Sequence, residues 1–279
     1  MAIVRLQHIG MAAADFPAAC GKLERIGLKA RDFRSDQGKG YQHDARVLLG
    51  NDCWIHVVHN WNPESRVARF LERDGQRLEH IALETDDIEA DVDRLRGLKV
   101  PIFEDTIFRA ADGYEAFVYP DDAVGFTVEL IQPHATSWGY PEKARCAPVS
   151  EKLGVVRAGH VRAVVRDVRE AAERFGSLFG LPEKSSPRTA EGSEPEAAFA
   201  FGNRCALLLC SNGTSEPESE GLTELGLHTG TFERDLRYLR AAAVRVRVEG
   251  GEQAVIPSED GAGFAIRLLA FASYTSASA

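Results

Sequence analysis

Four side chains that can bind a metal ion recur in pairs at almost equal spacing in the first half of the chain. His8 and His56 are separated by 48 residues, and His80 and Glu129 by 49. Two equivalent half-domains related by a local two-fold axis would bring these positions together. Imidazole nitrogens and a carboxylate oxygen suit Zn²⁺, Fe²⁺, Co²⁺, Ni²⁺ or Mn²⁺. The spacing therefore predicts one divalent transition metal, held by all four residues.

Strand parity supports the same set. Side chains alternate between the two faces of a strand, and apolar residues alternate with His56, His80 and Glu129 on their expected strands. If the apolar face packs under helices, these three side chains point into the opposite concavity. A lone strand histidine is more often a hydrogen-bonded core residue, so the prediction rests on the matched positions together. A buried Glu129 would also be unfavourable without a cation.

The elements expected to position these residues occur in the same order twice. Alternation, turn residues and helix caps predict a strand, a helix and three further strands in each half. The first half comprises a strand at 4–10, a helix near 15–26 and strands near 30–34, 41–49 and 53–59; the second comprises a strand at 78–84, a helix at 87–97 and strands near 101–105, 114–119 and 126–131. We thus predict two βαβββ modules that form one cupped sheet.

The whole arrangement is repeated once along the chain. Gly50-Asn51-x-Cys53 recurs as Gly202-Asn203-x-Cys205, at an offset of 152 residues. The sequence therefore predicts an α+β protein of two tandem domains. The expected boundaries are a metal-binding catalytic domain at 1–132 with modules at 4–60 and 78–131, a linker at 133–156, a second domain at 157–271 and a flexible tail at 272–279.

The second domain is predicted to be degenerate. Its residues at the four ligand positions are His160, Leu208, Glu224 and Arg267. Leucine cannot bind a metal, and a guanidinium that keeps its proton repels a cation. We expect Glu224 and Arg267 to form an ion pair that fills the unused site.

Length and composition limit the classes of function. The chain has 279 residues with a net charge of −9 and no basic block, which argues against a nucleic-acid partner. The sequence contains no run of about 18 apolar residues, the length needed to cross a membrane. The N-terminus lacks a signal-peptide pattern, and the five scattered cysteines contain no CxxC pair. We expect a cytoplasmic protein, monomeric or homodimeric, whose partner is a small-molecule substrate.

Several segments of the first domain carry a family resemblance. They are Leu6–Gly10, Arg69–Gly75, Leu78–Ile88, Tyr119–Asp121 and Phe126–Leu130. Together they resemble the vicinal oxygen chelate superfamily, which includes glyoxalase I, methylmalonyl-CoA epimerase, extradiol dioxygenases and bleomycin-resistance proteins. Locally the chain looks most like methylmalonyl-CoA epimerase. The second domain is similar only in its fold pattern.

The resemblance implies a cup of strands around a metal, with ligands at the positions of His8, His56, His80 and Glu129, and a substrate bound through two oxygens. A Lewis-acidic cation would polarise a carbonyl and stabilise an enolate, while Glu129, if displaced, could act as base. These expectations favour a metal-dependent isomerase, epimerase or lyase acting on a small oxygenated substrate.

Two alternatives remain open. One is an Fe(II)-dependent extradiol-type dioxygenase on an aromatic compound, although oxygen activation prefers three protein ligands to four. The family's epimerases usually have glutamine at the position of His56 and its glyoxalases glutamate, so the histidine leaves the substrate open. The other alternative is a sequestering protein of the bleomycin-resistance type, which binds a small molecule without a catalytic metal.

Further residues are candidates by type and position alone. His43 and Tyr41 are candidates for proton transfer, and Trp54, Tyr114 and Tyr119 for substrate binding. Trp54 shares the strand parity of His56 and could form a wall of the pocket. For each of these five, packing or solvation is an equally good interpretation.

Overall fold

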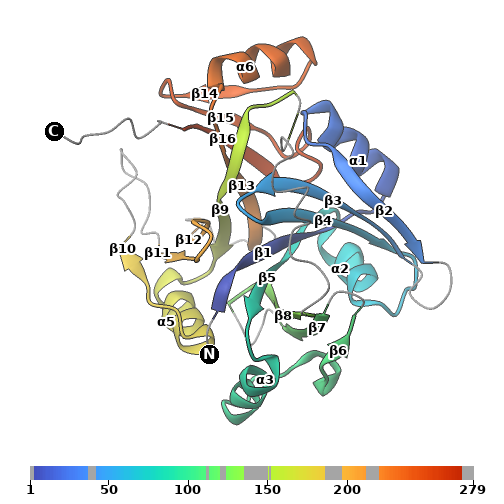
Figure 1. The fold of residues 1–279 in the computed structure, drawn as a ribbon, viewed down its shortest axis with the longest axis vertical. Helices are drawn as coiled ribbons and strands as arrows, with labels where there is room; N and C mark the ends of the chain where they lie inside the picture. Colours follow the sequence, from blue (N-terminus) through green and yellow to red (C-terminus); the bar gives the residue numbers. More distant parts are fainter. Residues whose placement is uncertain are drawn as a thin grey trace.

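The computed structural model describes residues 3–36, 42–110, 113–119, 124–134, 150, 152–185, 197–211 and 220–271. Within them the chain forms two eight-stranded sheets of mixed direction with few helices (Figure 1). The first unit comprises β1 (Ile3–Ala12), α1 (Phe16–Arg25), β2 (Ala30–Asp36), β3 (Gln42–Gly50), β4 (Cys53–Asn60), α2 (Arg66–Asp74), β5 (Arg77–Thr85), α3 (Ile88–Gly97), η1 (Phe103–Asp105), β6 (Phe108–Arg109), β7 (Gly113–Val118) and β8 (Thr127–Pro133).

The second unit repeats the same order. It comprises β9 (Val155–Val165), α5 (Val168–Phe179), β10 (Lys184–Ser185), β11 (Ala197–Ala200), β12 (Ala206–Ser211), β13 (Gly221–Thr229), α6 (Phe232–Ala241), β14 (Arg247–Glu249), β15 (Gln253–Ile256) and β16 (Ala265–Ala270). The predicted α+β fold of two tandem domains, each built from two βαβββ modules, is confirmed.

The pairing of the strands brings the ligand-bearing strands together. The first sheet has the order β2-β3-β4-β1-β5-β8-β7-β6, and the second has the equivalent order β10-β11-β12-β9-β13-β16-β15-β14. The two modules of the first sheet meet where β1 and β5 run antiparallel, and each of these strands has a parallel neighbour, β4 or β8. The strands of His8, His56, His80 and Glu129 therefore form the middle of one sheet.

The strand expected near 101–105 is wrong. Phe103–Asp105 form a short 3-10 helix, in which Glu104 and Asp105 have φ angles of 53° and 49°. Left-handed backbone conformations interrupt a strand. The edge strand β6 consequently begins at Phe108 and contains only two residues.

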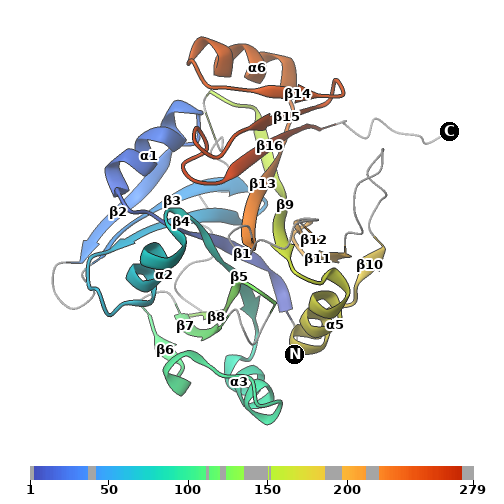
Figure 2. The same ribbon diagram turned by 180° about the vertical axis from the view of Figure 1, so that it is seen from behind.

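Helix α2 has no counterpart among the predicted elements. The Ser65 hydroxyl accepts a hydrogen bond from the Ala68 backbone N–H and caps the helix start. Val67 of this helix is buried against Ala12 and Val58, on the face of the sheet that carries the predicted metal ligands. The helix therefore covers one end of the cup, as Figure 1 shows from one side and Figure 2 from the other.

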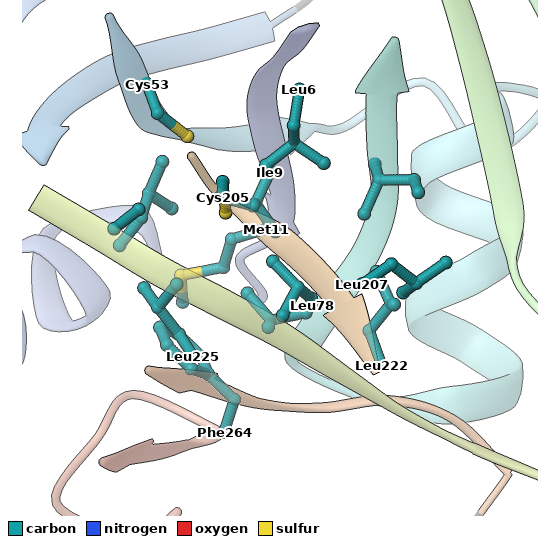
Figure 3. Packing of buried hydrophobic residues seen from close by; sticks show 14 of the residues in the cluster. Leu6, Ile9, Met11, Cys53, Leu78, Cys205, Leu207, Leu222, Leu225 and Phe264 are labelled. Carbon is teal, nitrogen blue, oxygen red and sulfur yellow. The ribbon is translucent and has the colours of Figure 1, made fainter. Parts of the chain in front are cut away.

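The two domains share one hydrophobic core. Leu6, Ile9 and Met11 of β1 belong to the same buried cluster as Leu225 of β13 and Phe264, and Figure 3 shows them packed together. The helices extend the contact at both ends of the molecule (Figures 1 and 2). There α6 meets the end of α1, and α3 meets α5, through side-chain hydrogen bonds to backbone carbonyls.

The repeated Gly-Asn-x-Cys motif forms a reciprocal contact between the domains. Asn51 Nδ2 donates to the Asn203 carbonyl at 2.8 Å, and Asn203 Nδ2 donates to the Asn51 carbonyl at 3.1 Å. Asn51 also accepts a hydrogen bond from the Ala158 backbone N–H in β9. Asn203 donates one to the Leu6 carbonyl in β1. The repeat seen in the sequence is thus a structural element that holds the domains in a fixed relation.

Some expectations fall on residues outside the described part of the chain. Most of the expected linker at 133–156, all of the tail at 272–279, and Tyr41 lie there. Among the described residues, no helix combines the length and the apolar character needed to cross a membrane.

Candidate metal centre

Three of the four predicted ligands converge on one point. His8 Nε2 lies 3.2 Å from His80 Nε2 and 3.3 Å from Glu129 Oε2, and His80 Nε2 lies 3.0 Å from Glu129 Oε2. The three residues are between 3% and 4% exposed. Two imidazoles and a carboxylate that present their ligand atoms at such distances suit a divalent transition metal. The donor set therefore fits the metal that the sequence predicts.

His56 lies beside this cluster, but its nitrogens are not among the ligand atoms that converge. Its ring centroid is 5.4 Å from that of His8, in an edge-to-face arrangement. Its Nε2 lies 3.8 Å from Asp44 Oδ1 of the neighbouring strand. Among the described residues, the group whose ligand atoms converge consists of His8, His80 and Glu129. The described cluster thus offers three groups that could hold a metal ion, with His56 and Asp44 close to each other beside it.

Burial and neighbouring charges set the protonation of the cluster. Burial lowers the pKa of His8 to about 4, although Glu129 opposes the shift. For His80 burial acts in the same direction, but the carboxylates of Glu79 and Glu129 outweigh it and raise the pKa to about 9. The two histidines hold the pKa of Glu129 well below its usual value in spite of burial. The neighbouring carboxylates thus favour the protonated form of His80, and a metal ion at its Nε2 would compete with that proton.

Gly10 leaves the space that the His80 ring occupies. A Cβ atom at residue 10 would collide with the ring atoms of His80. We expect Gly10→Ala to push the imidazole off its position and to weaken Co²⁺ binding by about tenfold or more. The affinity is measured by titrating the metal-free protein with Co²⁺. Gly21→Ala is the matched control, since a Cβ in that helix meets nothing within 4 Å; unchanged Co²⁺ affinity in Gly10→Ala would contradict the prediction.

The predicted proton-transfer residue His43 lies on the other face of the sheet. It pairs with His59 in the β3–β4 ladder, and its ring stacks on Phe16 of α1 with centroids 5.6 Å apart. His43 is therefore separated from the metal cluster by the sheet itself. The other candidate for this role, Tyr41, is outside the described residues.

The predicted substrate-binding residues have three different positions. Trp54 is buried and stacks on His8, with ring centroids 5.5 Å apart. Tyr119 is half-buried and meets Phe103 edge-to-face at 5.6 Å. Tyr114 is 38% exposed. It is three residues from Phe117, which pairs with Glu129, so Tyr114 lies on the face of the sheet opposite Glu129. Trp54 is adjacent to the metal cluster, Tyr119 borders the aromatic side of the cup, and Tyr114 faces away.

Two charged residues of β3 are on the cup face and were not predicted. Arg46 pairs with His56 in the ladder and is 6% exposed, with its guanidinium 5.3 Å from the Trp54 ring centroid. Asp44 is also buried, close to His56. Their alternation with Ala45 and the following valine is the sequence signal that could have placed them.

An aromatic side of the cup was also missed. Phe117 lies edge-to-face on His80 with centroids 6.0 Å apart, and Phe108 lies 6.3 Å from Phe117. Phe103 joins them at 5.8 Å from Phe108. Together with Trp54, which stacks on His8, these rings place aromatic side chains beside both histidines of the cluster.

In the second domain an ion pair occupies the equivalent position. Arg267 donates from Nε and Nη2 to the two carboxylate oxygens of Glu224, at 2.8 and 2.9 Å. His160 Nε2 lies 3.2 Å from the same carboxylate. The predicted Glu224–Arg267 pair is confirmed, and the described residues of this domain place a guanidinium where the first domain has the Glu129 carboxylate.

Comparison with known proteins assigns the first domain. Residues 5–130 match the family model of the Glyoxalase/Bleomycin resistance protein/Dioxygenase superfamily. The first domain belongs to this superfamily. Its βαβββ modules are those that the vicinal oxygen chelate resemblance implied. No curated protein matches the chain.

Solved structures extend the fold comparison beyond the vicinal oxygen chelate domain to both halves of the chain. A mutant of 4-hydroxymandelate synthase from Streptomyces coelicolor is similar over 97% of this chain and 93% of its own, with a TM-score of 0.72 and 15% identity. A xylose isomerase-like TIM barrel/4-hydroxyphenylpyruvate dioxygenase fusion protein is similar over 99% of this chain and 51% of its own, with a TM-score of 0.67 and 16% identity. Methylmalonyl-CoA epimerase from Mycobacterium tuberculosis is 25% identical over 48% of this chain and 91% of its own, with a TM-score of 0.43.

Proposed function

We propose that the first domain is a non-haem Fe(II)-dependent oxygenase that acts on an aromatic compound. The observation that carries this proposal is the convergence of only three ligand atoms, from His8, His80 and Glu129, while His56 faces Asp44. Two histidines and one carboxylate with open coordination positions are the ligand set of non-haem iron oxygenases. Four predicted ligands had favoured Lewis-acid chemistry, and the position of His56 outside the converging group reverses that preference.

The residues around the metal ligands suit an aromatic substrate. Trp54 stacks on His8, and Phe117 lies edge-to-face on His80. An iron(II) ion bound there would supply the one-electron chemistry by which dioxygen reacts with an organic substrate. Arg46, buried on the same face as His56, would pair with an anionic substituent such as a carboxylate.

In this proposal His56 would act as the general base. Its ring lies against that of His8, so a substrate hydroxyl at the metal would be within its reach. The proton from that hydroxyl would move to an imidazole nitrogen of His56. The Asp44 carboxylate, 3.8 Å from Nε2, would stabilise the resulting imidazolium.

The test begins with elemental analysis of protein purified anaerobically without a tag. About one equivalent of iron, together with oxygen uptake on addition of an aromatic diol, is the expected result. The panel contains catechol and 3,4-dihydroxybenzoate, which differ in the carboxylate that Arg46 would bind. No oxygen uptake by the iron-loaded protein with any diol would contradict the oxygenase.

The second candidate is the isomerase, epimerase or lyase favoured by the sequence. It is supported by the short distance of 5.4 Å between the His56 and His8 rings, because rotation of His56 would complete a four-ligand site. About one equivalent of Zn, Co, Ni or Mn and exchange of a substrate α-proton with solvent would favour it. Tight binding of a small molecule by metal-free protein without turnover would instead favour the sequestering protein.

Replacing His56 distinguishes its two possible roles. We expect His56→Ala to keep the full metal equivalent and to lower turnover about 100-fold or more, because a general base is lost while the ligands stay. Elemental analysis and the rate of turnover are the measurements. His59→Ala, on the opposite face of the same strand, is the control. Loss of the metal in His56→Ala would identify His56 as a ligand.

A further inference from the structure

Each metal-binding histidine directly follows a β-bulge. β1 and β5 pair antiparallel through the metal centre, but their register shifts on both sides of it. One shift leaves Gln7 as the extra residue of β1, directly before His8. Another leaves Glu79 as the extra residue of β5, directly before His80. A bulge lets two consecutive side chains turn to the same side of a sheet, so each histidine has its preceding residue beside it.

Glu79 binds the outer nitrogen of His80. His80 Nδ1 donates to Glu79 Oε2 at 2.5 Å, which leaves Nε2 directed at the cluster. Arg66, at the start of α2, forms an ion pair with the same carboxylate and lies 4.1 Å from the Phe117 ring centroid. Because α2 covers the end of the cup, its docking supplies the cation that holds Glu79 in place.

Gln7 has the same position for His8 but a different charge. His8 Nδ1 donates to Gln7 Oε1 at 3.1 Å. The amide is fixed by its Nε2, which donates to Glu84 Oε2 at 3.2 Å, and Arg5 donates to that same oxygen at 2.8 Å. His8 therefore has a neutral acceptor, with the carboxylate one residue further away.

The second domain has the same bulges but different side chains at them. β9 and β13 show register shifts at the same places, with Gly159 and Thr223 as the extra residues. These correspond to Gln7 and Glu79 at the repeat offsets of 152 and 144. The bulges thus belong to the fold, whereas an amide or a carboxylate occupies them in the domain whose described residues form the His-His-Glu cluster.

We propose that Glu79 and Gln7 are positioning residues that set the metal affinity through their histidines. A carboxylate that accepts the outer N–H of a metal-binding imidazole fixes the ring and strengthens its other nitrogen as a donor. Glu79 makes His80 the stronger nitrogen ligand, and the neutral Gln7 leaves His8 the weaker one. This inference rests on the metal centre of the proposed function and does not depend on which reaction the metal serves.

The test is a Co²⁺ titration of the metal-free full chain, followed by the visible absorption of the bound Co²⁺. We expect Glu79→Gln to weaken binding about 10- to 100-fold, because an amide replaces the carboxylate with little change of shape. The double variant Gln7→Glu/Glu84→Gln exchanges amide and carboxylate between two hydrogen-bonded positions at constant net charge. It should tighten Co²⁺ binding several-fold, about the reverse of the first effect. Glu84→Gln alone is its control.

The double variant keeps the test independent of stability, since a purely structural role for these residues would not tighten metal binding. Wild-type affinity in both Glu79→Gln and the double variant would overturn the positioning role while the metal centre stands. No Co²⁺ binding by the wild-type protein would overturn the metal centre, and this inference with it. A metal-binding wild type that turns over no aromatic diol would contradict the oxygenase alone.

Discussion

His80→Ala is expected to remove the metal entirely and to abolish turnover, with the fold retained. His80 Nε2 is within 3.2 Å of both other ligand groups, so its loss leaves two ligands that cannot enclose a cation. A centre with one histidine and one carboxylate has too few protein ligands for a transition-metal site. Elemental analysis of the variant, with circular dichroism as the check of folding, measures both parts of the prediction.

The control for this result is another histidine of the same domain. His43 lies across the sheet from the cluster, against Phe16, so His43→Ala should keep the full metal equivalent. Loss of metal in both variants would point to unfolding as the common cause. A full equivalent retained by folded His80→Ala would place the metal away from the described cluster.

The positions of the ligands could be predicted because they depend on internal symmetry. Once the chain is divided into repeated modules, the topology places β4, β1, β5 and β8 side by side, and parity then selects the face. The ion pair between Glu224 and Arg267 followed from the same logic, since a guanidinium stood at a carboxylate position in the repeat. The same equivalence also predicted His56 as a ligand, but its nitrogens do not converge with the other three groups.

Other features of the site depend on register and rotamers, which leave little trace in the sequence. The strand at 41–49 was expected, but whether His43 or Asp44 faces the cup depends on its pairing with β4. Gln7 and Glu79 reach their histidines through single-residue bulges, which composition does not reveal. His56 is on the expected face, yet its Nε2 lies 3.8 Å from Asp44 Oδ1 and it is not part of the converging group.

Helix α2 and the 3-10 turn were missed for a related reason. α2 contains nine residues, too few for its helical period to stand out, and it is stabilised by packing its apolar face on the sheet. The displaced strand at 101–105 has apolar residues suited to pairing, but the left-handed conformations of Glu104 and Asp105 end it. Both elements border the cup, so the surroundings of the metal were harder to predict than the metal ligands.

Glu224→Gln is expected to destabilise the second domain by about 3 kcal/mol at neutral pH. The carboxylate is buried and accepts two hydrogen bonds from Arg267, so its replacement leaves a guanidinium with half of its charge-assisted partners removed. Arg267 keeps its contact with Glu249 at 2.6 Å, which limits the loss. Urea unfolding at pH 7 measures the difference, and Glu173→Gln is the control, because that pair with Arg169 is exposed and contributes well under about 1 kcal/mol.

The same substitution should also change how stability depends on pH. Burial alone would raise the pKa of Glu224, but His160 and Arg267 outweigh it and lower the value to about 2, from 4.5 for the free side chain. A group whose pKa is lower in the folded state stabilises the fold above the unfolded value, and that contribution is lost as pH falls toward the folded value. Between about pH 4.5 and pH 2, unfolding of the wild-type protein should therefore take up about one proton more than unfolding of Glu224→Gln, and wild-type stability should fall more steeply as pH falls. Parallel pH profiles for the two proteins would show that the Glu224–Arg267 pair does not stabilise the second domain.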